Sequence, residues 1–516
     1  MLDDANKVPR GTTVRTGVCI VGGGAAGITL ARELAGGPHD VVLLESGGFK
    51  YAESTQDLYD GSVSGIPYDL DATRLRFFGG STNHWAGQCR PLDPSDFEAR
   101  DWVPGSGWPF GRDTLEPYYE RAQPMCNLGP FDYDAPSWID RLDGVQALYP
   151  AGDTLDTAVF QIAGGTNFST KYKKQLVKAR NVRLIMHANV VNVRTDGGRV
   201  VGVDVRTLEG NEFAVDATIV VLATGGIENA RTLLASRDAS PAGVGNDHDL
   251  VGRYFMDHTS VAVGQMVLAD RAPDPELYFF VGVDLADAGI PDLANGIRRT
   301  LLGAFALTPA AAAANQIPAF SASINPPVGQ VGDTIHDPDI TGLIGAVEGR
   351  GPTRAPKEIV VYGGEVQHAT DSFEMLVNME PTPSPDSRVT LSDDQDALGL
   401  PRAHLNWAID PSDWQSMETG VEVMARELGR LGLARLHRSP AERPDVVYGN
   451  HHMGTTRMHA DPTLGVVDAD CQVHGVANLY VAGSSVFPAV GFSNPTLTIV
   501  ALALRMAERI DQVLAT

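Results

Sequence analysis

The sequence predicts an α/β protein in which a nucleotide-binding sheet carries an inserted second layer, and three observations lead to this prediction. A glycine-rich turn joins an apolar run to a helical pattern within residues 17–45. The same order of strand, glycine and helix returns at residues 218–235, and an apolar helix follows another strand within residues 478–504. Strands that alternate with helices in this way favour a parallel sheet covered by helices.

The first unit has the pattern of a βαβ motif. An apolar run at 17–21 ends in glycines, an Ala- and Leu-rich segment follows at 25–34, and a second apolar run covers 40–45. Short runs of this kind are typical of parallel strands that are buried on both faces.

The second unit is preceded by three short apolar runs, at residues 182–186, 190–193 and 200–205. An Asp-Gly-Gly turn signal separates the last two runs, so the segment predicts a β-meander. A buried strand at 218–223 and a helix from about residue 228 to residue 235 follow it.

The third unit lies at the C-terminal end. After the strand within residues 478–483, Asn494 and Pro495 predict a helix start with a polar cap and a proline at the first helical position. Residues 497–504 are almost wholly apolar, which predicts that this helix is buried.

The segments between these units are richer in proline, aromatic and charged residues, and we expect them to form a layer inserted into the sheet. Cofactor and substrate would then meet at the seam between the two layers. The expected boundaries are 1–50, 171–260 and 441–516 for a discontinuous nucleotide-binding domain, 51–170 for a cap region, and 261–440 for a substrate-binding domain.

One long segment, residues 300–332, carries no charged side chain. Four prolines interrupt it, and this density prevents the continuous apolar helix of ~20 residues that a bilayer requires. The segment therefore predicts a plain loop, with a lid or a subunit contact as alternatives, and no membrane partner.

Composition argues against several classes of partner and site. The 64 acidic residues outnumber the 40 basic ones, and the net charge of -24 disfavours nucleic acid and anionic membrane surfaces. The four cysteines form no C-x-x-C pair and no Cys/His cluster, so neither a disulfide framework nor a metal site is predicted. Acidic residues stand near Met1 where an export signal needs a basic region, and we expect a cytoplasmic protein.

The glycine turn of the first unit has the sequence of a dinucleotide-binding fingerprint. Residues 22–27 match G-x-G-x-x-G, in which Gly22 makes the tight turn, Gly24 lets the backbone approach a pyrophosphate, and Gly27 admits close packing of helix on sheet. Glu45 ends the second strand, where a carboxylate can bind the hydroxyl pair of a ribose.

Four further motifs follow in order: Arg76-Phe-Phe-Gly-Gly-Ser-Thr-Asn-His-Trp-Ala-Gly87, Ala223-Thr-Gly-Gly-Ile-Glu-Asn-Ala-Arg231, His451-His-Met-Gly-Thr-Thr-Arg-Met458 and Gly491-Phe-Ser-Asn-Pro-Thr-Leu-Thr498. Together they resemble the glucose-methanol-choline (GMC) family of flavoprotein oxidoreductases over nearly the whole chain, apart from residues 260–360. Within that family, the G-G-S-T-x-H-W-like loop and the C-terminal N-P-T-L-T resemble the pyranose oxidase branch. Its bacterial relatives, the glycoside 3-oxidases and C-glycoside-oxidising enzymes, share this likeness.

The resemblance implies an FAD-binding Rossmann-like domain of the GMC and p-hydroxybenzoate hydroxylase-like type, with an inserted α+β substrate-binding domain. It implies FAD as the cofactor and no metal. Besides the fingerprint and Glu45, the residues that it places at the flavin are Ala26, Ser81, Asn83, His84, Trp85, Ala86, Val190, Ala223, Gly483, Asn494 and Thr496.

His84 aligns with the histidine that fungal pyranose oxidases join covalently to the flavin. Asn83 before it and Ala86 after the tryptophan depart from that pattern, so a covalent bond and a non-covalent contact are both kept as alternatives. The helix that begins near Thr496 would direct its backbone N–H groups toward the flavin pyrimidine edge, where such groups stabilise negative charge.

Alcohol oxidation needs a base beside the carbinol oxygen, and histidine is the natural choice because it titrates near neutrality. The family places this base at the head of H-x-x-G-T, which is His451 here, and a partner His or Asn at Asn494. We expect His451 to take the hydroxyl proton and the Asn494 amide to orient the hydroxyl. His452 is expected to be a packing residue.

The resemblance implies oxidation of a secondary hydroxyl of a sugar or glycoside, at C3 or C2, to a ketone, with oxygen or a quinone-like compound as acceptor. A separate deglycosylating enzyme would then consume a ketosugar product. Trp407, Trp414 and residues 365–368 are candidates for the aromatic and polar walls of a sugar pocket. Two alternatives remain, a GMC oxidase of a non-sugar alcohol and a GMC-fold lyase that keeps FAD as a structural element.

Overall fold

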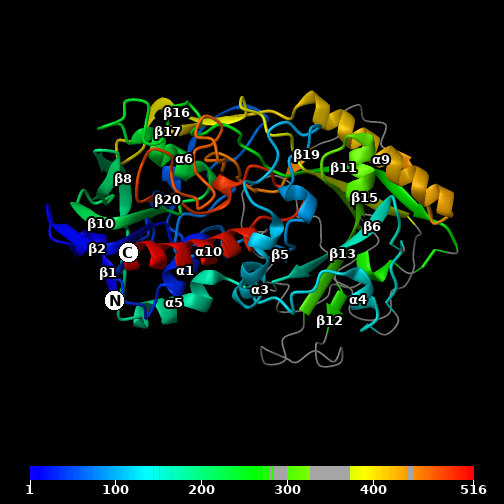
Figure 1. The fold of residues 1–516 in the computed structure, drawn as a ribbon, viewed down its shortest axis with the longest axis horizontal. Helices are drawn as coiled ribbons and strands as arrows, with labels where there is room; N and C mark the ends of the chain where they lie inside the picture. Colours follow the sequence, from blue (N-terminus) through cyan, green and yellow to red (C-terminus); the bar gives the residue numbers. More distant parts are fainter. Residues whose placement is uncertain are drawn as a thin grey trace.

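The computed structural model describes residues 1–142, 145–149, 151–163, 166–270, 272–273, 275–278, 281–283, 299–325, 372–438 and 446–516. Two large sheets lie toward opposite ends of the long axis (Figure 1). Helix α10 (Thr496–Ala515) begins between them and runs back to the end of the molecule where both termini lie.

The first sheet has the strand order β1-β7-β3-β2-β10-β9-β8, and β20 pairs with β10. Helix α1 (Ala25–Glu33) connects β2 to β3, which pair in parallel, so the predicted βαβ unit is confirmed. The strands are β1 (Leu2–Asp4), β2 (Thr13–Val21), β3 (Val41–Leu44), β7 (Val182–Met186), β8 (Asn189–Asp196), β9 (Arg199–Arg206), β10 (Glu212–Leu222) and β20 (Leu479–Val481).

The predicted β-meander is only partly present. Strands β8, β9 and β10 pair antiparallel as expected, but β7 pairs in parallel with β1 and β3. The meander prediction is therefore wrong for residues 182–186. The reason is that Leu184 and Ile185 are fully buried on opposite faces, as an interior strand of a parallel sheet requires.

The second sheet is antiparallel between the neighbouring strands of its main order, β18-β11-β15-β14-β13-β6-β5. Helix α9 (Pro411–Leu431) shares an apolar core with it, in which Met417, Val421 and Met424 join Phe320. The strands are β5 (Gln88–Cys89), β6 (Leu155–Ile162), β11 (Thr259–Leu268), β12 (Val281–Val283), β13 (Arg299–Leu307), β14 (Phe320–Asn325), β15 (Ser372–Met379), β18 (Ala434–Arg438) and β19 (Val446–Tyr448).

A small third sheet and several helices complete the described fold. The sheet contains β4 (Gly61–Gly65), β16 (Arg388–Gln395) and β17 (Pro401–Trp407). The remaining helices are α2 (Glu53–Gln56), α3 (Glu116–Met125), α4 (Ala135–Ile139), α5 (Phe168–Lys178), α6 (Gly226–Ala235) and α7 (Pro309–Asn315). The predicted domain boundaries stay a prediction.

The loop expected at residues 300–332 is wrong for the described part, 300–325, which contains β13, α7 and β14. The prolines do not break these elements, because Pro309 stands at the start of α7 and Thr308 caps it by accepting the N–H of Ala311. The charge-free sequence reflects burial of the strands rather than exposure as a loop.

Other expectations concern thiols, metals and membranes. All four cysteines are buried free thiols. Within the described ranges, no cluster of His, Cys, Asp and Glu has the geometry of a metal site. None of the helices described here has both the length and the apolar character needed to cross a bilayer.

A buried carboxylate at the end of β15 joins the second sheet to the rest of the chain. Glu380 is fully buried and accepts hydrogen bonds from both terminal nitrogens of Arg100, at 2.7 and 2.8 Å. It also accepts the backbone N–H groups of Ala319, Val490 and Gly491. Burial alone would raise the pKa of Glu380, but the charge of Arg100 lowers it below its ordinary value.

We predict that Glu380→Gln lowers the free energy of unfolding by about 3 to 5 kcal/mol, because it leaves the buried Arg100 without its counter-charge. Urea denaturation of the purified variant measures this change. Glu418→Gln is the control, since Glu418 pairs with Arg438 at an exposed site, and it should change the same quantity by less than about 1 kcal/mol. Equal effects of the two variants would contradict the prediction.

Candidate active site

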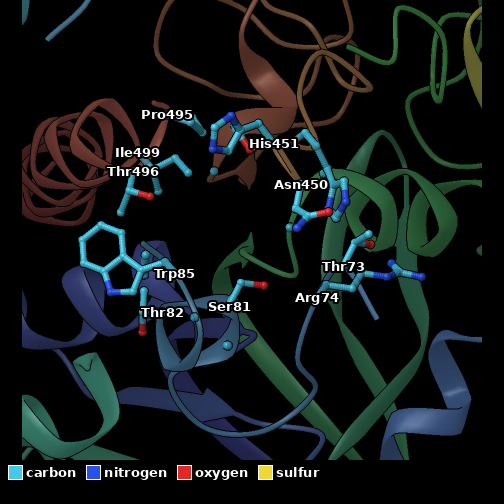
Figure 2. Close-up of a pocket in the computed structure, with 18 of the residues that line it drawn as sticks. Thr73, Arg74, Ser81, Thr82, Trp85, Asn450, His451, Pro495, Thr496 and Ile499 are labelled. Atoms are coloured by element: carbon cyan, nitrogen blue, oxygen red, sulfur yellow. Dashed lines mark hydrogen bonds between the residues drawn. The ribbon is translucent and has the colours of Figure 1, made fainter. Parts of the chain in front are cut away.

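A cavity of about 1230 Å³ lies where the two layers meet. The glycine turn after β2, the loop of residues 80–88, the start of α10 and one face of the second sheet form its walls. Figure 2 shows His451, Trp85, Ser81 and Thr496 pointing into it from different segments of the chain.

The glycine turn leaves the space that a dinucleotide needs. Helix α1 begins after Gly24 with no side-chain cap, so its first N–H groups are available to an anion. A Cβ at Gly24 would meet nothing within 4 Å, whereas one at Gly22 would approach Ala223 O to 2.5 Å and one at Gly27 would clash with Gly22. The cradle therefore fits the pyrophosphate of FAD.

Glu45 lies on the wall of the same end of the cavity. Its carboxylate accepts the N–H groups of Gly23 at 2.9 Å and Gly47 at 2.8 Å, which fix it beside the glycine turn. Each carboxylate oxygen can accept more than one hydrogen bond, so the expected contact with ribose hydroxyls is compatible with these bonds.

Most residues predicted to contact the flavin line this cavity. They are Gly22, Gly24, Ala26, Glu45, Ser81, His84, Trp85, Ala86, Val190, Ala223, Gly483, Asn494 and Thr496. Gly27 lies behind the wall, beneath Gly22. Asn83 also lies behind it, because its amide donates to Phe78 O at 3.1 Å and Gly80 O at 2.9 Å and so holds its own loop.

Trp85 has a well-defined place in this loop. Its indole N–H donates to Thr166 O at 2.6 Å, and its ring meets Phe168 edge to face. The indole therefore stands as a fixed side wall of the cavity, next to His84.

His451 and Asn494 come together although 43 residues separate them. His451 Nε2 lies 3.4 Å from Asn494 Nδ2, and both residues line the cavity. The backbone N–H of His451 donates to the buried Asp257 at 2.8 Å. Burial lowers the pKa of His451 well below its ordinary value, and nearby His258 and His452 lower it further, so its imidazole is neutral at pH 7.

The expectation that Asn494 caps the last helix is wrong. Helix α10 starts at Thr496, Pro495 occupies the cap position, and no side chain caps the helix. The Asn494 amide is instead placed against His451, where it can meet a substrate.

No sequence motif singled out His258, which stands just before β11. Its Nδ1 lies 2.9 Å from Nδ1 of His451, and its Nε2 lies 2.8 Å from Gly491 O. Burial lowers the pKa of His258 below its ordinary value. Asn494, the partly buried His451 and the buried His258 therefore form a row along the cavity wall.

His452 has the packing contacts expected of it, with its ring against Tyr68 and Phe255. It also borders the cavity, and its buried Nε2 has no hydrogen-bond partner within the described part of the chain. Burial, together with the charge of Arg74, lowers its pKa to about 3.

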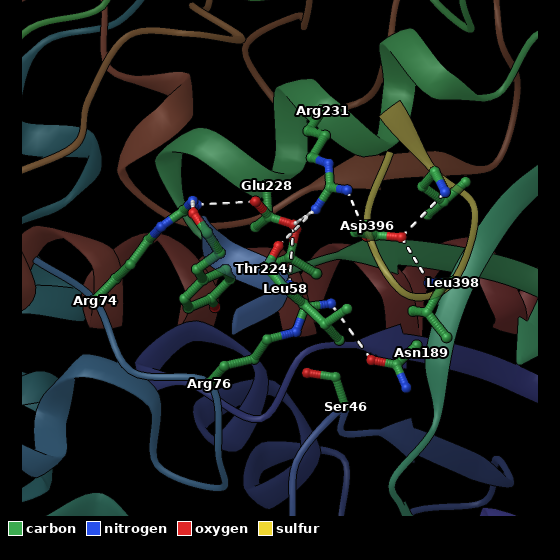
Figure 3. A network of polar contacts seen from close by, with 12 residues as sticks. Ser46, Leu58, Arg74, Arg76, Asn189, Thr224, Glu228, Arg231, Asp396 and Leu398 are labelled. Carbon is green, nitrogen blue, oxygen red and sulfur yellow. Dashed lines mark hydrogen bonds and ion pairs between the residues drawn. The ribbon is translucent and has the colours of Figure 1, made fainter. Parts of the chain in front are cut away.

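A buried charge network forms a second wall of the cavity (Figure 3). Glu228, in the first turn of α6, pairs with Arg74 at 2.9 Å, Arg76 at 3.1 Å and Arg231 at 3.2 Å. Arg231 also pairs with Asp396 at 2.6 Å. Burial alone would raise the pKa of Glu228, but the three arginine charges lower it to about 2. The sequence motifs contained Arg76, Glu228 and Arg231 but indicated no network.

The second sheet presents a polar row to the cavity. Ser260, Asn378 and Ser321 stand opposite one another on β11, β15 and β14, and Ser260 donates to the Asn378 side chain. Phe160 and Phe492 form an apolar surface of the same cavity. The period-2 pattern of β14 could have indicated its serines, but the pairing of the three strands was not visible in the sequence.

The aromatic candidates for a sugar wall lie elsewhere. Trp407 is buried against Tyr68 and Tyr448, and Trp414 packs with the core beneath α9, so neither lines the cavity. The prediction is wrong for both because apolar burial competes for tryptophan more often than ligand binding does. Residues 365–368 lie outside the described residues.

The comparisons with known proteins agree with this geometry. Residues 383–503 match the family described as GMC oxidoreductase, and residues 17–242 match FAD dependent oxidoreductase. The chain is 24% identical to 2-methyl-1,2-propanediol dehydrogenase of Mycolicibacterium austroafricanum, over 96% of this chain and 95% of that protein. It is 25% identical to paromamine 6'-oxidase of Streptomyces fradiae, over 96% and 91%. The C-glycoside 3-oxidase of Arthrobacter globiformis is 36% identical, over 23% of each chain.

Among solved structures, the pyridoxine 4-oxidase of Mesorbium loti matches with a TM-score of 0.59 and 19% identity, over 96% of this chain and 99% of that one. The predicted fold class, an FAD-binding Rossmann-like domain with an inserted α+β substrate-binding domain, is confirmed, and the substrate-binding part contains the antiparallel second sheet. FAD as the cofactor is confirmed by the family matches. The chain therefore has the GMC fold and matches the GMC oxidoreductase family over residues 383–503, and these likenesses support an FAD-dependent oxidoreductase that acts on alcohols.

Proposed function

We propose that this enzyme oxidises a secondary hydroxyl of a sugar or glycoside, at C3 or C2, to a ketone, and passes the electrons to oxygen or a quinone-like acceptor. The observation that carries the oxidation of a hydroxyl group is the meeting of His451 Nε2 and Asn494 Nδ2 at 3.4 Å on the cavity wall. A neutral imidazole and a carboxamide at this spacing can together hold one hydroxyl group.

His451 has the role of base in this proposal. Its lowered pKa keeps the imidazole unprotonated at neutral pH, so Nε2 can accept the hydroxyl proton as the C–H bond breaks. Bound FAD would supply the acceptor for the hydride of the carbinol carbon. Asn494 donates to the substrate oxygen and holds it beside Nε2.

The cofactor contacts of the chain follow from the cavity wall. Gly24 and the N-terminus of α1 would hold the pyrophosphate, and Glu45 would hold the ribose. The first N–H groups of α10, near Thr496, have no side-chain cap and would stabilise negative charge on a bound flavin. His84 lies on the wall, where either a covalent bond to the flavin or a non-covalent contact fits.

The walls near His451 support a sugar as substrate. Ser260, Asn378 and Ser321 offer hydroxyl and amide groups on one surface, and Phe160 and Phe492 offer an apolar surface. A pyranose ring presents hydroxyls at its edge and C–H groups on its faces, which suit such a combination. The partial likeness to a C-glycoside 3-oxidase supports the same substrate class.

A non-sugar alcohol is the second candidate. It is favoured by the likeness to 2-methyl-1,2-propanediol dehydrogenase, which extends over 96% of this chain. The same His451 and Asn494 would serve either substrate, because both act on the reacting hydroxyl alone.

A substrate screen tests the proposal directly. The FAD-loaded enzyme is mixed without air with monosaccharides, O- and C-glycosides, and simple diols, and the flavin absorbance is followed. We expect bleaching by a sugar or glycoside, and NMR of the product should locate a ketone at C3 or C2. Bleaching by diols alone would favour the second candidate, and product formation without bleaching would indicate a lyase. Peroxide formation in air then identifies oxygen as an acceptor.

We predict that His451→Ala lowers turnover of the identified substrate by roughly 10²-fold or more, because the positioned base is lost. FAD content, measured by absorbance after purification, should stay unchanged. His404→Ala is the control, since His404 hydrogen-bonds Ser62 and Ser64 at an exposed site. Near-normal turnover in His451→Ala would reject the role of His451.

We predict that Gly24→Val abolishes FAD binding, because its side chain would fill the open space of the cradle. The backbone of Gly24, at φ -85°, accepts a side chain, so the protein should still fold. Gly429→Val is the control, since a Cβ there also meets nothing within 4 Å but lies in α9 away from the cavity. A Gly24→Val protein with a full flavin complement would contradict the placement of the pyrophosphate.

A further inference from the structure

The histidine behind His451 has a protein partner at each ring nitrogen. His258 Nδ1 lies 2.9 Å from Nδ1 of His451, and His258 Nε2 lies 2.8 Å from the carbonyl oxygen of Gly491. The two rings meet edge to face, at 85° between their planes. His258 is buried and His451 is partly buried, and these contacts decide where the ring protons reside.

The carbonyl of Gly491 can only accept a hydrogen bond, so Nε2 of His258 must carry a proton. A neutral imidazole has one N–H and one acceptor nitrogen, which makes Nδ1 of His258 the acceptor. Nδ1 of His451 must then be the donor, and the lone pair of His451 lies on Nε2. The Asn494 amide agrees with this assignment, because its Nδ2 donor is the atom that faces Nε2.

The opposite arrangement requires His258 to be a cation. Its Nδ1 would then donate to His451, and the proton of His451 would reside on Nε2, where it prevents action as a base. Burial disfavours that cation by lowering the pKa of His258. Glu380, whose charge acts in the other direction, is already paired bidentately with Arg100.

We propose that His258 is a positioning residue that holds the ring proton of His451 on Nδ1 and so leaves Nε2 free to accept the hydroxyl proton of the substrate. This inference rests on the proposed function of His451. When the substrate O–H bond breaks and the Nε2–H bond forms, His451 becomes a cation whose Nδ1–H still donates to His258. The bond from His258 to Gly491 O then helps to stabilise that positive charge.

Two variants of His258 test the proposal. His258→Leu can make neither hydrogen bond, and we expect the rate of flavin reduction, measured by stopped flow without air, to fall about tenfold or more. His258→Gln keeps an acceptor for His451 and a donor for Gly491, so it should restore most of that rate. His474→Leu is the control, since His474 also contacts a backbone carbonyl, His459 O at 2.9 Å, but lies away from the cavity.

A double-mutant cycle separates positioning from general damage. If His258 acts through His451, adding His258→Leu to His451→Ala should slow flavin reduction by less than about twofold. If His258 had only a structural role, His258→Leu would instead slow flavin reduction by the same factor in the unaltered protein and in His451→Ala. Nitrogen-15 NMR of histidine-labelled protein, with the His451 signals identified by their loss in His451→Ala, should show the Nδ1–H form in the unaltered protein and in His258→Gln.

The outcomes are distinguishable from failure of the proposed function. If His451→Ala itself reduces flavin at a normal rate, the base assignment fails. If His451→Ala is slow but His258→Leu is normal, or slows both backgrounds equally, only the positioning role fails. An Nε2–H signal for His451 in the unaltered protein would also overturn it.

Discussion

The short loop of residues 490–494 is the constraint on which the arrangement of the site depends. Glu380 accepts the N–H groups of Val490 and Gly491 and thereby ties the loop to the second sheet. The carbonyl of Gly491 meets His258, and the amide of Asn494 meets His451. The buried carboxylate of Glu380 therefore helps to position the Gly491 carbonyl and the Asn494 amide, which contact His258 and His451. It forms no hydrogen bond with either histidine ring.

The two polar clusters around the cavity use different physical chemistry. At Glu228, the charges of three arginines compensate for burial and lower the pKa of the carboxylate. Among the described residues, no carboxylate forms an ion pair with the ring of His451 or His258, and burial lowers the pKa of both imidazoles. The first cluster is suited to holding segments of the chain together, whereas the second can change its protonation state during a reaction.

Much of the nucleotide-binding layer could be predicted from the sequence, because its signals are local. The glycines of residues 22–27 and the apolar runs on either side specify a turn, a helix and two strands without reference to distant residues. The pairing of β7 could not be predicted in this way, since its neighbour β3 precedes it by more than a hundred residues. Strand β13 was missed because a strand buried on both faces lacks the alternation of a half-exposed one.

The residues of the site also fall into two groups, those that sequence motifs indicated and those that only the folded structure brings together. His451 and Asn494 stand in motifs that the family resemblance identified, and the structure brings them within 3.4 Å. His258 depends on a contact with a residue 193 positions away, and Ser260, Asn378 and Ser321 depend on the register of three strands. Such contacts leave no local pattern, so only the folded chain reveals them.

Gly491 limits how far this region can change during evolution. Its φ of 54° suits glycine, and a Cβ there would approach a carboxylate oxygen of Asp96 to 2.3 Å. Any larger residue would have to displace Asp96 and turn the carbonyl away from His258. Divergence toward new substrates is therefore easier through Ser260, Asn378 or Ser321, whose side chains can be exchanged without moving the backbone of the loop.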